Sequence, residues 1–367
     1  MNFLDHASTC PVVKYPQQLY RNVLGEGYFF NPNANYAYEE KRLLAEAEDR
    51  VKKAIGAKGG KVIFGGTSSQ LIENLMAAVN DIFHWDDNQY MTLGSYVEHD
   101  SFNRYIVHKC ADLENLDEWL SYYNDTQTFV LWQAVQNITG EIFPTKQIGE
   151  LVHKYNACYI CDGTAQIGHT PIEPNIDDWC DFYVFSGHKL GTELGIGCCW
   201  VSDRLDKWFN GFELHGTPNL AGALAMTQAV EDACDKKFLY ERIWHYSDLA
   251  IFLNNELIKS NLEYNFIPEY PDDNEQPFAY AINAIRLPEF NADALQQFLA
   301  SKQVYISIGG SACAEKHDYR ILETGYNLTK QEASEVIRIS FGQNSTVEDI
   351  EALVKNICEF KKTYLNN

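Results

Sequence analysis

Apolar and polar residues fall into blocks that predict strands and helices in alternation. Thr128–Val135, Cys158–Asp162 and Asp181–Phe185 are nearly continuous apolar runs, with the length expected of strands buried on both faces. Tyr38–Ile55 has apolar residues at helical spacing, and a further helix is predicted over Thr145–Tyr155, between two of the strands. Strands that alternate with helices predict an α/β fold with a mainly parallel sheet.

A second, smaller α/β domain is predicted near the C-terminus. Its expected elements are a strand, a helix and a strand: Ala279–Leu287, Ala292–Lys302 and Val304–Ile308. A long helix over Ala221–Ser260 is expected to link the two domains. We therefore assign residues 16–245 to a large domain, and residues 1–15 together with 246–367 to the small one.

Charge and composition narrow the classes of function. The 367-residue chain has a net charge of −22, which argues against nucleic acid as a partner because phosphate backbones need a basic face. No apolar run approaches the roughly 20 residues of a membrane span, and no signal peptide is evident at the start. Ten cysteines then fit reduced thiols, so we expect a cytoplasmic protein with no membrane partner.

One cysteine pair has the C-x-x-C spacing of many metal sites. Cys158 and Cys161 both lie in a predicted strand, where residues three apart point to opposite faces. A second such pair is missing from the sequence, so we expect no bound metal.

The candidate chemistry lies where two of the predicted strands end. Asp162 closes one apolar run, and the run after it leads into Ser186-Gly187-His188-Lys189. The carboxyl ends of parallel strands form the ligand-binding edge of an α/β sheet. A lysine held there can have its ammonium pKa lowered, which suits Schiff-base chemistry, and a nearby acid can pair with the ring nitrogen of pyridoxal phosphate.

Ser-Gly-His-Lys after a strand-end Asp-Gly-x-x-Gln resembles the class V aminotransferase superfamily, and within it most closely the cysteine desulfurases. The resemblance covers nearly the whole chain. It implies a fold-type-I pyridoxal phosphate enzyme in which Lys189 carries the imine bond to the cofactor and Asp162 anchors the ring nitrogen. Gln166 would contact the phenolic oxygen, and Ser186 and His188 would hold the phosphate. Three residues separate Asp162 from Gln166 where the family commonly has two, so we expect a bulged turn.

Two further segments are candidates for holding the phosphate. Gly65-Gly66 and three hydroxyl residues precede a predicted helix, where backbone N–H groups can face an anion, although such residues are also ordinary helix caps. By resemblance the contact is made by Thr67, Ser68 or Ser69. Thr217, in a Gly-Thr-Pro turn, would reach the phosphate of a neighbouring subunit, which implies a homodimer.

Other expected contacts also come from the resemblance. His99 would stack on the cofactor ring and move protons, which its near-neutral pKa permits. Asn137 would lie near the cofactor and the substrate, and Arg338 would bind the substrate carboxylate with a two-pronged hydrogen bond. Asn31, before Pro32, is as consistent with a plain loop as with a substrate contact.

A cysteine in a glycine- and serine-rich loop decides the predicted reaction. The segment from Gly309 to Cys313 resembles the one that bears the desulfurase nucleophile, and a thiolate is a strong nucleophile near neutral pH. The prediction is therefore conversion of L-cysteine to L-alanine with a persulfide on Cys313, passed to a sulfur-acceptor protein. Alternatives are a cystine or selenocysteine lyase, an aminotransferase or epimerase, and a non-catalytic scaffold. An NAD enzyme is disfavoured because no G-x-G-x-x-G opens a strand–helix unit.

Overall fold

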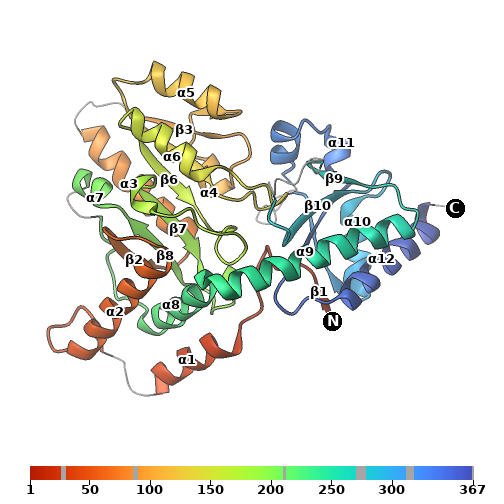
Figure 1. Ribbon diagram of the computed structural model, residues 1–367, viewed down its shortest axis with the longest axis horizontal. Coiled ribbons are helices and arrows are strands. Elements are labelled where there is room, and N and C mark those ends of the chain that lie inside the picture. Colours follow the sequence, from red (N-terminus) through yellow and green to blue (C-terminus); the bar gives the residue numbers. More distant parts are fainter. Residues whose placement is uncertain (26–29, 86–89, 210–211, 270–277, 311–317, 366–367) are drawn as a thin grey trace. The chain divides into compact units, whose positions relative to one another are not determined.

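The computed structural model describes residues 1–25, 30–85, 90–209, 212–269, 278–310 and 318–365 (Figure 1). These residues form two compact units. The large unit comprises Pro11–Ala134 and Phe143–Leu239. The small unit comprises Met1–Cys10, Val135–Ile142 and Tyr240–Asn367. The assignment of residues 16–245 and of 1–15 with 246–367 to two folding domains stays a prediction.

A seven-stranded sheet is the framework of the large unit. In spatial order its strands are β2 (Lys61–Gly65), β8 (Gly197–Val201), β7 (Phe182–Ser186), β6 (Cys158–Asp162), β5 (Gln127–Gln133), β3 (Tyr90–Ser95) and β4 (His108–Cys110). Neighbours from β7 to β4 pair in parallel, whereas β8 is antiparallel to both β7 and β2. The predicted α/β fold with a mainly parallel sheet is confirmed.

Helices cover both faces of this sheet (Figure 1). One face packs on α2 (Tyr38–Ala54), α5 (Leu113–Tyr122), α6 (Thr145–Lys154) and α8 (Leu220–Cys234). The other packs on α3 (Ser68–Trp85), α4 (Asp100–Asn103) and α7 (Asp203–Trp208). Because side chains alternate along β6, Cys158 belongs to the second core and Cys161 to the first, so the two thiols point to opposite faces as the spacing predicts.

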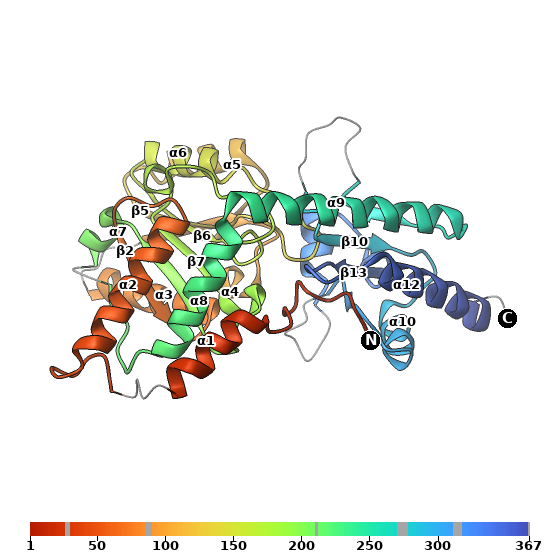
Figure 2. The same cartoon turned by 60° about the horizontal axis from the view of Figure 1, so that its bottom comes forward.

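The remaining helix of the large unit packs against α8. Residues Lys14–Gly25 form α1, and Val23 at its end contacts a small apolar cluster with Ala47, Leu220 and Leu224. In Figure 2, α1 and α2 lie beside α8. Proline at the third position of α1 is tolerated because the first turn of a helix leaves its N–H groups unpaired in any case.

The predicted long helix over Ala221–Ser260 is two helices. The chain leaves α8 at Asp235, whose backbone is extended, and α9 runs over Lys236–Lys259. Asp235 Oδ1 accepts hydrogen bonds from the N–H groups of Lys237 (3.0 Å) and Phe238 (3.2 Å). The aspartate therefore acts as an N-cap and starts a new helix.

The small unit contains an antiparallel sheet ordered β12 (Ser307–Ile308), β13 (Val336–Ser340), β10 (Ile282–Arg286) and β9 (Asn265–Ile267). A separate parallel pair joins β1 (Asn2–Phe3) to β11 (Val304–Tyr305). The strand expected over Val304–Ile308 is thus divided between two sheets. The helices of the small unit are α9 from Tyr240 onward, α10 (Ala292–Ser301), α11 (Lys330–Ala333) and α12 (Val347–Phe360), with helical turns over Ile321–Gly325 and Lys361–Leu365.

The helices of the described residues differ from membrane-spanning segments. None of them combines the length and the apolar character that crossing a bilayer would require.

Candidate active site

The two residues that anchor the predicted site lie at the same edge of the large sheet. Asp162 is the last residue of β6 and pairs in register with Val184 of the neighbouring strand β7. That strand ends at Ser186 and passes directly into a single 3-10 turn, Gly187–Leu190, which carries Lys189. Because β6 and β7 are parallel, both functional groups lie at the carboxyl edge of the sheet.

His99 lies close enough to Asp162 and Lys189 for the charges of both to affect its pKa. It precedes α4, and its Nδ1 accepts a hydrogen bond from the Ser101 N–H at 3.2 Å. Burial lowers the pKa of His99, with the Lys189 charge acting in the same direction and Asp162 and Asp100 opposing it. The imidazole is therefore neutral at pH 7 and, since Nδ1 is an acceptor, carries its proton on Nε2.

A buried carboxylate next to His99 secures the segment that carries it. Glu98 is 0% exposed; its Oε1 accepts from Ser95 Oγ at 2.5 Å and its Oε2 from the Gln133 N–H at 3.0 Å. Gln133 in turn donates from Nε2 to the Val97 carbonyl at 2.6 Å. These contacts join the ends of β3 and β5. Sequence reasoning gave Glu98 no role, because its partners Ser95 and Gln133 come from the ends of two different strands.

The hydroxyl residues predicted to hold a phosphate meet at the start of α3. Ser186 Oγ donates to Ser68 Oγ at 2.8 Å and accepts from the Ser68 N–H at 3.0 Å. Thr67 Oγ1 accepts from the Gln70 N–H at 3.1 Å, and Ser69 is the second residue of the helix. Of the three hydroxyl candidates from this loop, Ser68 is therefore the one held directly against the strand end that carries Ser186.

His188 lies in the turn between Ser186 and Lys189. Burial, and then the neighbouring Lys189 charge, lower the pKa of His188 to about 4. The side chain is neutral at physiological pH, so it can contribute to an anion site as a hydrogen-bond donor rather than as a cation.

Gln166 follows Asp162 in a hydrogen-bonded turn and is directed into protein. Its Oε1 accepts from the Tyr183 hydroxyl at 2.9 Å, its Nε2 donates to the Pro171 carbonyl at 3.0 Å, and the residue is 2% exposed. The contact of Gln166 with a phenolic oxygen of the cofactor stays untested, but both ends of the amide already have protein partners.

Asn31 and Thr217 are brought together on the surface of the large unit. Asn31 Nδ2 donates to Thr217 Oγ1 at 3.3 Å, and Asn33 Nδ2 donates to the Gly216 carbonyl at 2.9 Å. Both Asn31 and Thr217 are exposed. These contacts join the loop before α2 to the loop before α8.

The remaining described candidates belong to the small unit. Arg338, on β13 and 3% exposed, donates from Nη1 to the Asn137 carbonyl and from Nη2 to Asp5 Oδ1, both at 2.9 Å. Nη2 also contacts Ser8 Oγ. Its Nε is buried and has no partner within the described parts of the chain. Sequence reasoning missed Asp5 and Ser8 as partners of this arginine.

Cys313 lies outside the described residues. The described chain approaches it from β12, where Ser307 pairs in register with Arg338 of β13. The Gly309 N–H then donates to the Val336 carbonyl at 2.7 Å. The segment that leads to the cysteine thus pairs with the strand that carries the candidate carboxylate-binding arginine.

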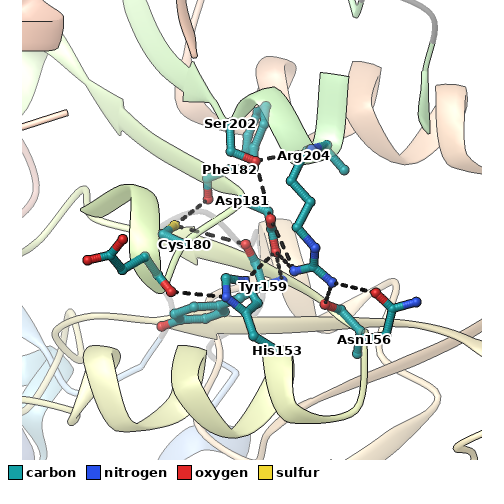
Figure 3. Close-up of polar contacts among 11 residues, drawn as sticks. His153, Asn156, Tyr159, Cys180, Asp181, Phe182, Ser202 and Arg204 are labelled. Carbon is teal, nitrogen blue, oxygen red and sulfur yellow. Dashed lines mark hydrogen bonds and ion pairs between the residues drawn. The ribbon is translucent and has the colours of Figure 1, made fainter. Parts of the chain in front are cut away.

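A second buried aspartate lies at the opposite edge of the large sheet, just before β7 (Figure 3). Asp181 Oδ2 accepts from His153 Nε2 and the Tyr159 N–H, each at 2.9 Å, and from Arg204 Nη1 at 3.1 Å. Its Oδ1 accepts from Ser202 Oγ at 3.2 Å. This carboxylate ties α6, β6 and α7 together, and its oxygens are fully used by protein donors.

The residues at the carboxyl edge fit pyridoxal phosphate. They combine hydroxyl and imidazole donors for a phosphate, a carboxylate for a ring nitrogen and a primary amine for an aldehyde. A Cβ on Gly197 would lie 2.7 Å from the Thr67 carbonyl carbon, so glycine lets β8 approach the loop that begins α3. Among the described residues no cluster of three or more His, Cys, Asp or Glu side chains could hold a metal ion.

A cavity of about 340 Å³ lies elsewhere, within the small unit, and is lined partly by Phe266, Arg286 and Tyr326. None of the residues predicted for cofactor or substrate binding lines it.

Comparison with known proteins identifies the family of the chain. The putative cysteine desulfurase IscS 1 of Bacillus subtilis is 23% identical, with 98% of each chain covered. The cysteine desulfurase IscS of Dictyoglomus turgidum is 25% identical over 95% of this chain and 91% of its own. The crystal structure of a NifS-like protein from Rickettsia africae superposes with a TM-score of 0.83 at 21% identity, covering 99% of this chain and 100% of that one. The Aminotransferase class-V family pattern matches residues 104–353, more than half of the sequence. Members of this family are pyridoxal phosphate enzymes, and the chain belongs to the class V aminotransferase family.

Proposed function

We propose that this protein is a pyridoxal phosphate-dependent cysteine desulfurase. The observation that carries the proposal is the convergence of Asp162, Lys189 and the neutral His99 at the carboxyl edge of the large sheet. The curated relatives named as cysteine desulfurases, together with the Gly309–Cys313 motif, favour this activity over other class V reactions.

The proposed reaction removes sulfur from L-cysteine. The C–S bond of the substrate breaks, a bond forms between its sulfur and the Cys313 thiolate, and a proton completes the methyl group of L-alanine. Substrate and enzyme thiol together become alanine and an enzyme persulfide, so no external oxidant or reductant is needed. Bound pyridoxal phosphate supplies the electron sink for charge that develops at the α-carbon of the substrate.

The residues of the large unit have distinct proposed tasks. The Lys189 amine would hold the cofactor through its aldehyde, and the same amine would move the α-proton of the substrate. Asp162 would pair with the ring nitrogen and favour its protonated form. His99 would stack on the ring, and its Nε2–H could deliver a proton. Ser68 and Ser186 hold the phosphate, with His188 as a neutral donor and Thr67 and Ser69 beside them.

The residues of the small unit are assigned to the substrate. The Arg338 guanidinium matches a carboxylate with two parallel donors, and its present partner is the carboxylate of Asp5. Asn137, whose carbonyl accepts from the same arginine, is the second contact we assign to the substrate, and Asn31 is a third.

The proposed active form is a homodimer that delivers sulfur to an acceptor protein in the cytoplasm. Exposed Thr217 and Asn31 form one surface of the large unit, available to the phosphate of a second subunit. Nine cysteines are free thiols in the described parts of the chain, which supports a reducing compartment. Light scattering should give twice the monomer mass, and a monomer with full activity would contradict this arrangement.

Visible spectroscopy with product analysis tests the function. We expect the wild-type protein to be yellow, to change spectrum on addition of L-cysteine and to form alanine. Lys189→Ala should lose the yellow band of the bound cofactor, whereas Lys154→Ala, on the surface, should keep it. A retained band in Lys189→Ala would refute the assignment.

The thiol is tested by a matched pair of cysteine variants. Cys313→Ala should keep the bound cofactor and lose catalytic alanine formation, whereas Cys358→Ala in the small unit should retain it. Unchanged desulfuration by Cys313→Ala, or pyruvate as the product, would instead indicate a C–S lyase that works without a nucleophilic thiol.

A further inference from the structure

The turn that follows Asp162 is fixed by its own backbone. The Gly163 N–H donates to the Val184 carbonyl of β7 at 2.9 Å, and the Gln166 N–H closes the turn on the Gly163 carbonyl at 3.0 Å. Inside this turn, the Thr164 N–H donates to Asp162 Oδ1 at 2.9 Å. The orientation of the Asp162 carboxylate therefore depends on where the turn places one backbone N–H group.

A buried side-chain contact holds the turn against β7. The Tyr183 hydroxyl donates to Gln166 Oε1 at 2.9 Å, and Gln166 Nε2 reaches the Pro171 carbonyl at 3.0 Å. We call the hydrogen-bonded pair Tyr183 and Gln166 the brace. Tyr183 is 0% and Gln166 is 2% exposed. Thr164 and Ala165, which lie in the turn between Asp162 and Gln166, are partly exposed.

The ring of Tyr183 also packs directly on the turn. A Cβ at Gly163 would lie 2.1 Å from Tyr183 Cζ and 2.2 Å from its hydroxyl oxygen. A side chain at this position would push the ring away or shift the turn, so glycine allows the close approach that the brace needs. Tyr183 thus contacts both ends of the turn: its ring packs on Gly163, and its hydroxyl donates to the Gln166 amide.

We propose that Gln166 is a positioning residue: together with Tyr183 it sets the turn that orients Asp162, and it makes no direct contact with bound pyridoxal phosphate. The inference rests on the proposed role of Asp162 as the partner of the ring nitrogen. Hydrogen bonds weaken steeply as their angle departs from linear, so a small rotation of the carboxylate lowers its affinity for an N–H donor. A brace that fixes the Thr164 N–H prevents that rotation.

A double-mutant cycle on the affinity for pyridoxal phosphate tests the brace. Gln166→Met keeps the side-chain volume and removes the amide, and Tyr183→Phe removes one hydroxyl. We expect each to weaken cofactor binding about fivefold, the value of one net hydrogen bond, and the double variant to bind no more weakly than the weaker single variant. Absorbance titration of apoprotein with the cofactor measures the affinity, and far-UV circular dichroism checks the fold.

The Asp162→Ala background distinguishes positioning from contact. Because the brace acts through Asp162, adding Tyr183→Phe or Gln166→Met there should change the affinity no further. A direct contact of Gln166 would give Gln166→Met an additional loss in this background, and an effect of Gln166→Met without one of Tyr183→Phe would overturn the proposal in the same way. If Gln166→Met does not fold, Tyr183→Phe in the two backgrounds decides alone.

Two other outcomes separate this inference from the proposed function. If the brace variants lower only the melting temperature of the apoprotein and leave the affinity unchanged, the brace is merely structural and the inference fails. If Asp162→Ala itself leaves cofactor affinity and spectrum unchanged, the proposed role of Asp162 fails, and the inference fails with it.

Discussion

Two buried aspartates at opposite edges of the large sheet show how the same type of side chain can serve either stability or ligand binding. Asp181, before β7, accepts hydrogen bonds on both oxygens from an imidazole, an amide, a hydroxyl and a guanidinium (Figure 3). Asp162, at the end of β6, has one hydrogen bond, from the Thr164 N–H, within the described parts of the chain. Burial of a charge is costly unless it is paired, so Asp181 is satisfied by the protein, while Asp162 keeps acceptor capacity for a ligand.

The largest expected effect is on activity, at Asp162. Asp162→Ala should lower the rate of alanine formation about a hundred- to a thousandfold, because it removes the charge that favours a protonated ring nitrogen. Its free energy of unfolding should change by no more than about 1.5 kcal/mol, the value of one hydrogen bond. Single-turnover kinetics and urea unfolding measure the two quantities. If Asp162→Ala were strongly destabilised yet fully active, Asp162 would serve stability rather than activity, and the contrast with Asp181 would be wrong.

The complementary change is expected to act on stability. Asp181→Ala leaves the Arg204 guanidinium and three other donors without their acceptor, which should cost about 3–5 kcal/mol of unfolding free energy. Activity per folded molecule should be preserved. Asp178→Ala, on the exposed turn nearby, is the matched control and should stay within about 0.5 kcal/mol of wild type. Equal destabilisation by the two substitutions would show that the network around Asp181 is not a stabilising one.

A single donor to Asp181 should matter less. His153→Leu removes the Nε2 bond to Asp181 and the Nδ1 contact with the Asp178 carbonyl, but leaves the other three donors to Asp181 in place. We expect a loss of about 1–2 kcal/mol, the net value of the two imidazole contacts. Urea unfolding of His153→Leu, Asp181→Ala and the double variant measures the coupling. Additive losses would mean that His153 does not act through Asp181.

A final effect concerns the pH dependence of the apoprotein at the carboxyl edge. Burial lowers the pKa of His188 from 6.5 to about 4, so between these values the unfolded chain binds a proton that the folded chain does not. Stability contributed by the neutral imidazole is therefore present above pH 6.5 and lost as the pH falls toward 4. Unfolding at pH 7 and pH 5 should show a smaller difference in His188→Asn than in wild type. If the change in unfolding free energy between pH 7 and pH 5 were the same in both proteins, the His188 side chain would be solvated rather than buried.

Much of the fold can be predicted from the sequence because the strands depend on the local pattern of apolar residues. Continuous apolar runs identify β5, β6 and β7, and parallel pairing then brings Asp162 and the Ser186–Lys189 turn to one edge. The break between α8 and α9 was missed because apolar residues continue on both sides of Asp235. Only its capping contacts with Lys237 and Phe238 show that it begins a helix.

The details of the site were less predictable because they depend on partners distant in sequence. The pose of Gln166 is decided by Tyr183, which looks like an ordinary apolar strand residue. Asp5 lies 333 residues from Arg338 in the chain, so no local signal could join them. Asp181 resembles a residue that merely bounds a strand, and its network appears only when α6, β6 and α7 are brought together.

The interleaved course of the chain has a consequence for biosynthesis. Val135–Ile142 belongs to the small unit although it interrupts the large one, and β1 at the N-terminus pairs with β11 near residue 304. Once Asn2 and Phe3 have been synthesised, about 300 more residues must therefore follow before their strand partner is made. No contiguous gene fragment encodes the residues of one unit alone, and a nascent chain that stalls before Val304 would leave the small unit without the pairing of β1 with β11.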